Sequence, residues 1–185
     1  MEFTKIVMDF PIIPMSPDQW PVVLEIYGEG VASGNATFET ELPDWDKWDA
    51  NHRNDCRLVA LEPFEEDVGD LIVPLTNVEV LGWAALSAVS ARRVYRGVAE
   101  VSVYVAARAR GRGVGKALLQ ALVLESEVNG IWMLQSGIFP ENVASIALHK
   151  ACGFRKVGIR HRIGKLGDRW RDVVLLERRS EKIGR

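Results

Sequence analysis

The stretch RARGRGVGKALL, residues 108–119, decides the fold prediction because it places flexible residues and positive charge directly before a helical pattern. Upstream, AEVSVYV (residues 99–105) alternates between a polar and an apolar face, as a strand does. Downstream, apolar residues recur at helical spacing over residues 114–128, and Asn129-Gly130 ends the pattern. A strand, a glycine-rich turn and a helix in this order predict an anion-binding site.

An anion fits this place because the first turn of a helix has backbone N–H groups without partners and lies at the positive end of the helix dipole. Glycines let phosphate oxygens approach the backbone closely, and Arg110, Arg112 and Lys116 add positive charge. Pyrophosphate is therefore the expected guest. The alternative is a glycine-rich loop that only begins a helix.

Three phosphate-binding patterns compete for this loop. A Walker loop requires Ser or Thr after Gly-Lys, whereas Ala117 follows Gly115-Lys116 here. The dinucleotide fingerprint Gly-x-Gly-x-x-Gly fails because the third glycine comes one residue early. The third pattern, Arg/Gln-x-x-Gly-x-Gly/Ala, matches residues 110–115 at every position.

The rest of the chain predicts strands that alternate with helices. SPDQW at residues 16–20 indicates the start of a helix that runs to about residue 33, and a short helix follows near residues 46–53. Residues 154–177 alternate and turn at residues 166–170, as a hairpin does. Strands are predicted at residues 57–61, 78–86, 100–105 and 131–138, and a loop at residues 62–70. This order favours a mixed α/β sheet with helices packed on it.

The helix predicted at residues 142–152 brings polar groups together. Asn142, Ser145 and His149 stand at i, i+3 and i+7, so they share one face and span about 10 Å along the axis. Its expected inward stripe consists of Ala144, Ala147, Leu148 and Ala151.

Composition narrows the class of protein. A chain of 185 residues, 48% hydrophobic and 26% charged, is typical of one soluble globular domain. The net charge of −2 favours neither nucleic acid nor an anionic membrane as a partner, and no apolar run is long enough to span a bilayer. The N-terminus has acidic residues where a signal peptide has basic ones. Cys56 and Cys152 form no disulfide framework, so a reducing cytoplasm is the default.

Residues 110–115 resemble the coenzyme A loop of the GNAT superfamily of N-acetyltransferases. Residues 26–41, 94–105, 137–154 and 167–177 resemble its phosphinothricin N-acetyltransferase branch, which acetylates phosphinothricin and methionine sulfoximine or sulfone. The resemblance implies a single N-acetyltransferase domain over residues 1–185, with a GNAT fold whose mixed central sheet is flanked by helices on both faces. It also implies acetyl-CoA as cosubstrate, no metal, a small-molecule amine acceptor and a cytoplasmic homodimer.

The resemblance implies where the cosubstrate binds. The main chain of Val103, Tyr104 and Val105 is expected to hydrogen-bond the pantetheine arm, and the Tyr104 side chain either packs or takes part in the site. The remaining expected contacts are Arg110, Gly111, Arg112, Gly113, Val114, Gly115, Lys116, Asn142 and Ser145.

Acetyl transfer to an amine requires a neutral amine, a donor for the carbonyl oxygen and a way for the thiolate to leave. Glu100, on the polar face of the strand before the loop, is the expected base, acting through a water or with a pKa raised by burial. The alternative is a structural glutamate that pairs with an arginine. His149 occupies the position of the superfamily's tyrosine acid, so it is either the general acid for the thiolate or a structural residue.

The acceptor site is expected from the resemblance at Phe38 and Glu39 and in the segment before Glu100. Arg92 or Arg93 is either an anchor for an acceptor carboxylate or a solvated loop charge. Val89-Ser90 stands where members that act on phosphinothricin have a Trp followed by Arg or Lys, so the side-chain pocket is expected to differ. A small amino-acid-like acceptor is the first hypothesis. A polyamine or protein amine, or a catalytically silent CoA-binding module, are the alternatives.

Overall fold

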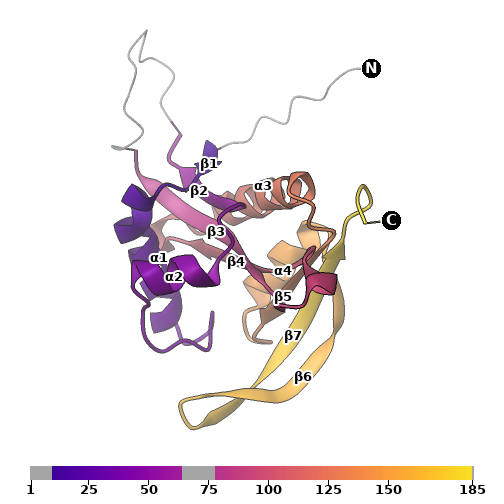
Figure 1. Cartoon of the computed structure of the whole chain (residues 1–185). Helices are drawn as coiled ribbons and strands as arrows, with labels where there is room; N and C mark the ends of the chain where they lie inside the picture. Colours follow the sequence, from indigo (N-terminus) through magenta and orange to yellow (C-terminus); the bar gives the residue numbers. More distant parts are fainter. Residues whose placement is uncertain (1–9, 64–77, 185) are drawn as a thin grey trace.

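The computed structural model describes residues 10–63 and 78–184. One seven-stranded sheet in the order β1-β2-β3-β4-β5-β7-β6 forms its centre, with α1 to α4 packed around it (Figure 1). The predicted mixed sheet with helices on both faces is therefore confirmed. Residues 1–9, which carry most of the sequence used to argue against a signal peptide, and residues 64–70 of the predicted acidic loop lie outside the described residues.

The strands agree closely with the alternating patterns. Strand β2 has the predicted bounds, and each of the next three strands differs from its prediction by two residues at one or both ends. Strand β1 was missed because it is a three-residue edge strand that ends in a proline, where no ladder bond is required. The strands are β1 (Ile12–Pro14), β2 (Arg57–Leu61), β3 (Val80–Ala88), β4 (Val98–Val105), β5 (Met133–Ile138), β6 (Arg155–Leu166) and β7 (Arg169–Arg179).

The helices cover the two faces of the sheet in pairs. Helices α1 (Trp20–Ala32) and α2 (Trp45–Asn51) lie on one face, where Tyr27 and Trp48 both contact Trp83 of β3. Helices α3 (Val114–Val128) and α4 (Val143–Ala151) lie on the other face (Figure 1). A 3₁₀ turn at Pro17–Gln19 precedes α1, so the predicted helix start is right and its first turn is tighter than an α-helix.

Aromatic side chains fill the space between the sheet and the first helix pair. The ring of Trp83 stacks on Tyr104 of β4 at 4.8 Å, and Tyr27 meets Tyr104 edge-on at 4.9 Å. Trp48 and Trp83 are each 1% exposed. Because side chains alternate along a strand, Glu100 and Ser102 lie on the same face of β4 as Tyr104.

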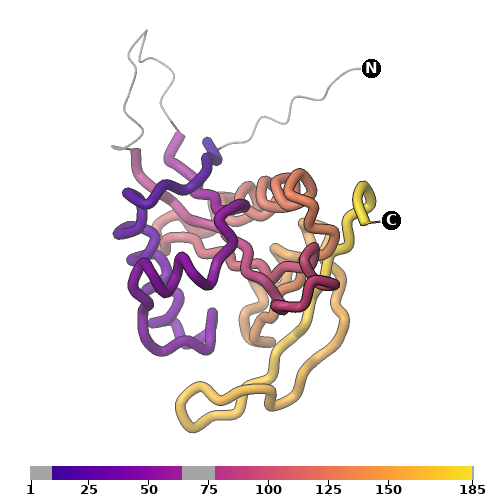
Figure 2. The backbone as a smooth tube through the Cα atoms, viewed as in Figure 1, coloured from indigo at the N-terminus to yellow at the C-terminus, as the bar shows by residue number. Residues whose placement is uncertain are grey.

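The hairpin of β6 and β7 extends well beyond the body of the molecule (Figures 1 and 2). Its turn at Gly167-Asp168 lies inside the predicted turn region. A bulge interrupts β6 between Arg160 and Gly164, where Asp172 accepts hydrogen bonds from the Arg162 N–H and from His161 Nδ1, both at 2.8 Å. The bulge brings Gly164 against Phe38, which belongs to the segment between α1 and α2.

Candidate active site

The middle of the sheet opens into a fork between two parallel strands. Strands β4 and β5 pair only from Val98–Glu100 to Met133–Gln135 and then diverge, although both continue. On its other side β4 pairs with β3 as far as Val105. The backbone of residues 101–105 therefore presents donors and acceptors toward β5 without a strand partner, and buried groups of this kind require one.

A cavity of about 480 Å³ lies beside this fork. Its walls come from four places: the end of α1 with the turn after it, the second half of β4, the glycine loop with the first turn of α3, and the start of α4. All of the predicted cosubstrate residues except Arg112 line it: Val103, Tyr104, Val105, Arg110, Gly111, Gly113, Val114, Gly115, Lys116, Asn142 and Ser145.

The glycine loop has a conformation that suits an anion. Gly111 and Gly113 have φ angles of 77° and 94°, which residues with a Cβ adopt only with strain. Gly113 is the N-cap of α3, and within the described part of the chain no side chain caps that end. Gly115 has a different reason to lack a side chain: an ideal Cβ there would lie 3.2 Å from Leu148 and 3.3 Å from Val105.

The three cations of the loop do not all face the cavity. Arg110 and Lys116 line it, with one Arg110 nitrogen 3.8 Å from Glu29 of α1. Arg112 turns to the opposite side, where its guanidinium pairs with Glu62 and lies over the ring of Phe10. The expectation that Arg112 binds cosubstrate therefore lacks geometric support, because its charge is already used to tie the loop to the end of β2.

Helix α1 also contributes to the cavity, which was not predicted from the sequence. Ile26, Gly30 and Ser33 line the cavity from α1 and its C-terminal end, followed by Asn35 and Ala36. A signal was present: Gly30 is a glycine inside a helix, and an ideal Cβ there would be 2.6 Å from the ring of Tyr104. Tyr104 is partly buried between the helix and the sheet, and this desolvation raises its pKa, so its hydroxyl stays protonated.

Glu100 is the last residue of β4 that pairs with β5, at the base of the fork. Its Oε2 accepts a hydrogen bond from Gln135 Nε2 at 3.0 Å, and its side chain is half-buried. An ideal Cβ on the exposed Gly137 would lie 3.8 Å from Oε1, so this oxygen faces the open part of the fork. Among the described ion pairs none involves Glu100, so the alternative of an arginine-paired structural glutamate gains no support.

His149 lies apart from the cavity. Helix α4 turns Asn142, Ser145 and Leu148 toward it, while His149 is 3% exposed and packs edge-on against Phe154. Its Nδ1 lies 2.9 Å from the carbonyl oxygen of Ser145, so Nδ1 carries the proton and Nε2 has none to give. Burial lowers the pKa of His149, which disfavours the charged form as well. The predicted role as general acid is therefore disfavoured by this placement.

The same rotation of α4 corrects its predicted inward stripe. Ala144, Ala147 and Ala151 are exposed, and Ile146 and His149 face the core instead, whereas Leu148 packs against the core as predicted. Asn142 keeps a place in the site because its Oδ1 caps α4 at the N–H of Ser145. Its Nδ2 also donates to the carbonyl oxygen of Asn35 at 3.2 Å, which joins two walls of the cavity.

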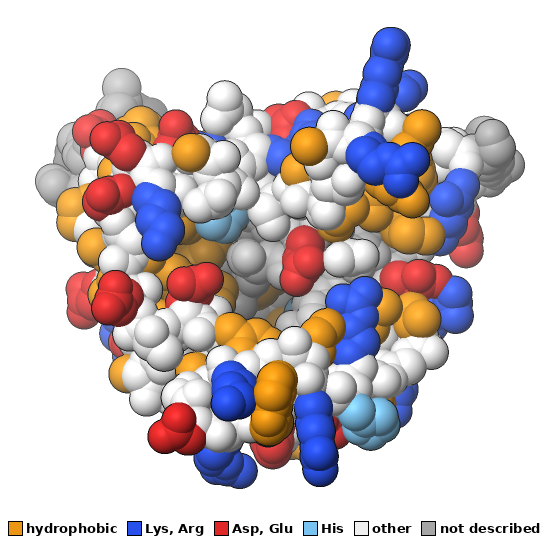
Figure 3. Space-filling model, turned by 60° about the horizontal axis from the view of Figure 1, so that its bottom comes forward, with side chains coloured by type: hydrophobic (Ala, Val, Ile, Leu, Met, Phe, Trp, Pro, Cys, Tyr) orange, Lys and Arg blue, Asp and Glu red, His pale blue; other side chains and the backbone are white. Residues whose placement is uncertain are grey.

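Phe38 and Glu39, the two residues after α1 that were predicted to border the acceptor, lie in different places. Phe38 packs edge-on against Phe139 at 4.8 Å, and the guanidinium of Arg171 lies 3.9 Å from the Phe139 ring centroid. Glu39 instead lines a second cavity of about 270 Å³, with the aromatic rings of Tyr27 and Trp48 in its wall. The face of the molecule that includes the hairpin end is hollowed at its centre (Figure 3).

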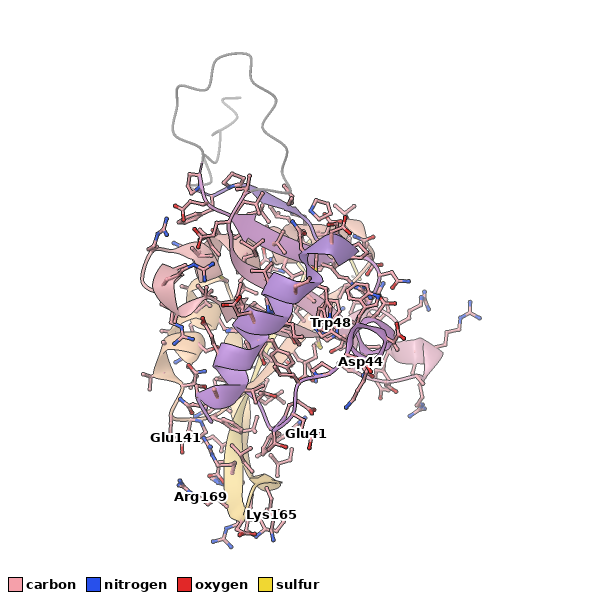
Figure 4. All side chains as sticks on the ribbon, turned by 90° about the vertical axis from the view of Figure 1, so that its left-hand side faces the viewer. Glu41, Asp44, Trp48, Glu141, Lys165 and Arg169 are labelled. Atoms are coloured by element: carbon pink, nitrogen blue, oxygen red, sulfur yellow. The ribbon has the colours of Figure 1, made fainter. Side chains whose placement is uncertain are left out.

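Arg171 ties the rim of this region together. From β7 it donates to the carbonyl oxygen of Gly34 at 3.0 Å and to Glu141 Oε2 at 3.1 Å. Glu141 immediately precedes Asn142, so one buried arginine links the turn after α1 to the start of α4. Figure 4 shows Glu141 alongside the projecting part of the hairpin, with Lys165 and Arg169 at its far end.

Arg92 and Arg93 lie in the turn between β3 and β4, and both are exposed. The Arg92 guanidinium lies 5.7 Å from the ring centroid of Tyr95, and neither arginine lines a described cavity. Glu100 lines neither of these two cavities either, and the role of the two arginines as carboxylate anchors stays a prediction.

Residues 10–63 and 78–184 lack two further kinds of feature. No group of three or more His, Cys, Asp or Glu side chains in these ranges could hold a metal ion. None of the helices in these ranges is both long and apolar enough to cross a membrane.

Comparison with known proteins gives consistent matches. The sequence pattern of the Acetyltransferase (GNAT) family matches residues 35–154. The chain is 35% identical to a phosphinothricin N-acetyltransferase from Alcaligenes faecalis, over 87% of this chain and 78% of the relative. It is 30% identical to an L-methionine sulfoximine/L-methionine sulfone acetyltransferase from Pseudomonas paraeruginosa, over 85% and 87% of the two chains. A phosphinothricin acetyltransferase from Sinorhizobium meliloti, solved with acetyl-CoA, superposes with a TM-score of 0.75 at 28% identity, over 95% and 96%.

Proposed function

Since the chain belongs to the GNAT family of acetyltransferases, we propose that it transfers the acetyl group of acetyl-CoA to the primary amine of a small amino-acid-like acceptor, by direct attack in a ternary complex. The observation that carries the proposal is the cavity that joins the first turn of α3 to the fork between β4 and β5. Such a cavity offers an anion site at one end and unpaired strand backbone along its side.

The residues present fit the cosubstrate, which supplies a thioester for the amine to attack. The open N-terminus of α3, with Gly111 and Gly113 leaving its backbone bare, holds the pyrophosphate, and Arg110 and Lys116 add charge. The backbone of Val103–Val105 hydrogen-bonds the pantetheine arm. Asn142 and Ser145 form the opposite wall.

Glu100 removes the proton from the acceptor ammonium, because only the neutral amine has a lone pair. Glu100 stands three residues before Val103, which is roughly 10 Å along a strand, so a water relays the proton. The backbone N–H groups of the unpaired part of β4 stabilise the charge that develops on the carbonyl oxygen. The CoA thiolate leaves as the amine nitrogen bonds to the acetyl carbon, and it takes its proton from solvent. His149 has no part in this scheme, because its Nε2 carries no proton and lies outside the cavity.

The acceptor class rests on the relatives and on the rim of the site. Both of the relatives named above act on small amino-acid-like molecules according to their names. We propose that Phe38 and Glu39 border the acceptor and that Arg92 or Arg93 anchors its carboxylate. Val89-Ser90 supports a side-chain pocket that differs from one for phosphinothricin, so other amino acids are expected to be better acceptors.

The last part of the proposal concerns the cellular compartment, the oligomeric state and the domain organisation of the protein. We propose that the enzyme works in the cytoplasm as a homodimer and forms a single domain over residues 1–185. Free Cys56 and Cys152 agree with a reducing compartment. The exposed apolar residues of the projecting hairpin agree with an interface.

The first experiment measures release of free thiol from acetyl-CoA with a series of acceptors. The series contains L-amino acids, phosphinothricin, L-methionine sulfoximine and sulfone, polyamines and a peptide amine. Amine-dependent release with the amino acids is expected, and Glu100→Gln should lower kcat/KM about a hundredfold, as the loss of a general base does. Dissociation of CoA from Glu100→Gln should be unchanged.

Two outcomes would reject the proposal. Absence of thiol release above the amine-free background with every acceptor, together with intact CoA binding, would favour a CoA-binding module. A preference for polyamines or peptides, or for the amide of each amino acid over the acid, would move the acceptor to another class. Comparing each acid with its amide on Arg92→Ala and Arg93→Ala tests the anchor separately.

A further inference from the structure

We propose that Gln135 is a positioning residue that holds the Glu100 carboxylate with one oxygen directed into the open part of the fork. The inference rests on the proposed function, in which Glu100 accepts the acceptor's proton. It starts from the register of the sheet: Glu100 and Gln135 are paired residues at the last pair before β4 and β5 diverge. Their side chains therefore leave the same face of the sheet next to each other.

The contact between them fixes one of the two carboxylate oxygens. Gln135 Nε2 donates to Glu100 Oε2 at 3.0 Å, and both side chains are half-buried. The other oxygen, Oε1, faces Gly137, the next residue of β5 on the same face. Gly137 is exposed and has no side chain to cover Oε1, although Val173 of β7 borders the same space, with its Cγ1 3.1 Å from an ideal Cβ on Gly137.

The neighbours of Gln135 explain why an amide suits this position. On β7 its register partner is Glu177, which is paired with Arg155 of β6. Gln135 thus stands between two carboxylates. An amide donates a hydrogen bond without adding charge, so it orients Glu100 and leaves its negative charge uncompensated. An acid at this position would repel both neighbours, and an apolar residue would leave Oε2 without its donor.

A general base must be oriented toward the proton that it removes, and one hydrogen bond to its carboxylate contributes enough free energy to affect the rate. The loss of such a bond is expected to lower kcat roughly tenfold. Because Gln135 acts through Glu100, this loss should vanish when Glu100 is itself replaced. A residue with a merely structural role would show its effect in either background.

The experiment is a double-mutant cycle with Gln135→Met and Glu100→Gln, with L-methionine sulfone or the best acceptor of the series as probe. Met has nearly the length of Gln and no donor. Gln120→Met, on the exposed side of α3, is the matched control. Gln135→Asn, which keeps the amide but shortens the reach, is the second variant if Gln135→Met does not fold. CoA binding is measured by calorimetry for every variant.

Gln135→Met or Gln135→Asn should lower kcat about tenfold in the wild-type background, have no further effect in Glu100→Gln, and leave the CoA dissociation constant within about twofold. Equal effects in both backgrounds, an unchanged kcat, or a parallel loss of CoA affinity would each overturn the positioning role. If Glu100→Gln itself keeps the wild-type rate, the proposed base is wrong, and that result is distinct from a failure of Gln135 alone.

Discussion

At the scale of single residues, His149 shows how the orientation of one ring decides between two roles. Its ring is buried against Phe154 and its Nδ1 is committed to a backbone carbonyl. The spacing of Asn142, Ser145 and His149 predicted a shared face, and the structure keeps the first two in the cavity. Residues four apart differ by about 40° around a helix, and the edge of the cavity-facing side of α4 falls between Ser145 and His149.

His149→Phe should therefore keep kcat within about threefold of wild type at neutral pH, because no proton donor is lost from the site. Its effect should appear in stability instead. Below about pH 6.5 this histidine becomes protonated in the unfolded chain, whereas in the folded protein it stays neutral down to a lower pH. The free energy of unfolding should then fall by about 1.4 kcal/mol per pH unit for this group as the pH decreases toward the lowered pKa.

Chemical denaturation at intervals from pH 8 to pH 5 measures this slope. Burial lowers the pKa of His52 in the same way, so His149→Phe should retain part of the acid dependence and lose part. Identical slopes for the variant and wild type, or a loss of kcat by a factor of about a hundred, would restore His149 as a candidate acid.

At the scale of elements, the glycine loop separates two arginines that look equivalent in sequence. Arg110 lines the cavity, whereas Arg112 is paired with Glu62 and lies over Phe10. Arg110→Ala should weaken CoA binding about five- to tenfold, because a charge-assisted contact to phosphate at an exposed site is lost. Arg112→Ala should change the dissociation constant by less than about twofold, because its charge is used elsewhere.

Calorimetric titration with CoA at two salt concentrations distinguishes these cases. The loss in Arg110→Ala should shrink at high salt, since the contact is electrostatic. Equal losses in the two variants would mean that Arg112 turns toward the phosphates when they bind.

The elements also show what the sequence can and cannot predict. Alternation and helical spacing located α3 to the residue and four of the strands to within two residues, because each pattern is local. The fork could not be predicted from such patterns, because the alternation within β4 or β5 does not indicate how many of their residues pair with each other. The contribution of α1 to the cavity had a local sign in Gly30, but its partner Tyr104 is 74 positions away in the chain.

At the scale of the whole molecule, the projecting hairpin carries the clearest unpaired surface. Strand β6 is the edge of the sheet, and Val157, Ile159, Ile163 and Trp170 are exposed on the hairpin. An exposed apolar edge strand favours association. The wild-type protein is expected to be a dimer at about 10 µM, and Ile159→Lys should shift it to monomer by burying a charge in the interface.

Sedimentation velocity at several concentrations tests this expectation. Val128→Lys is the matched control, because Val128 is 82% exposed on α3 and is not one of the exposed apolar residues of the hairpin. The control should sediment as wild type does. A wild-type protein that stays monomeric throughout the range would contradict the proposed interface.

Because of the fork between β4 and β5, the lifetime of the protein in the cell is expected to depend on the concentration of acetyl-CoA. Only three residue pairs join the two halves of the sheet, so a ligand that hydrogen-bonds the unpaired backbone takes the place of missing rungs. A ligand that binds only the folded chain stabilises it by an amount that grows with its concentration, about 2.7 kcal/mol at a hundredfold excess over the dissociation constant. Proteases that attack the opened chain would then spare this protein while acetyl-CoA is plentiful and remove it sooner when acetyl-CoA is scarce.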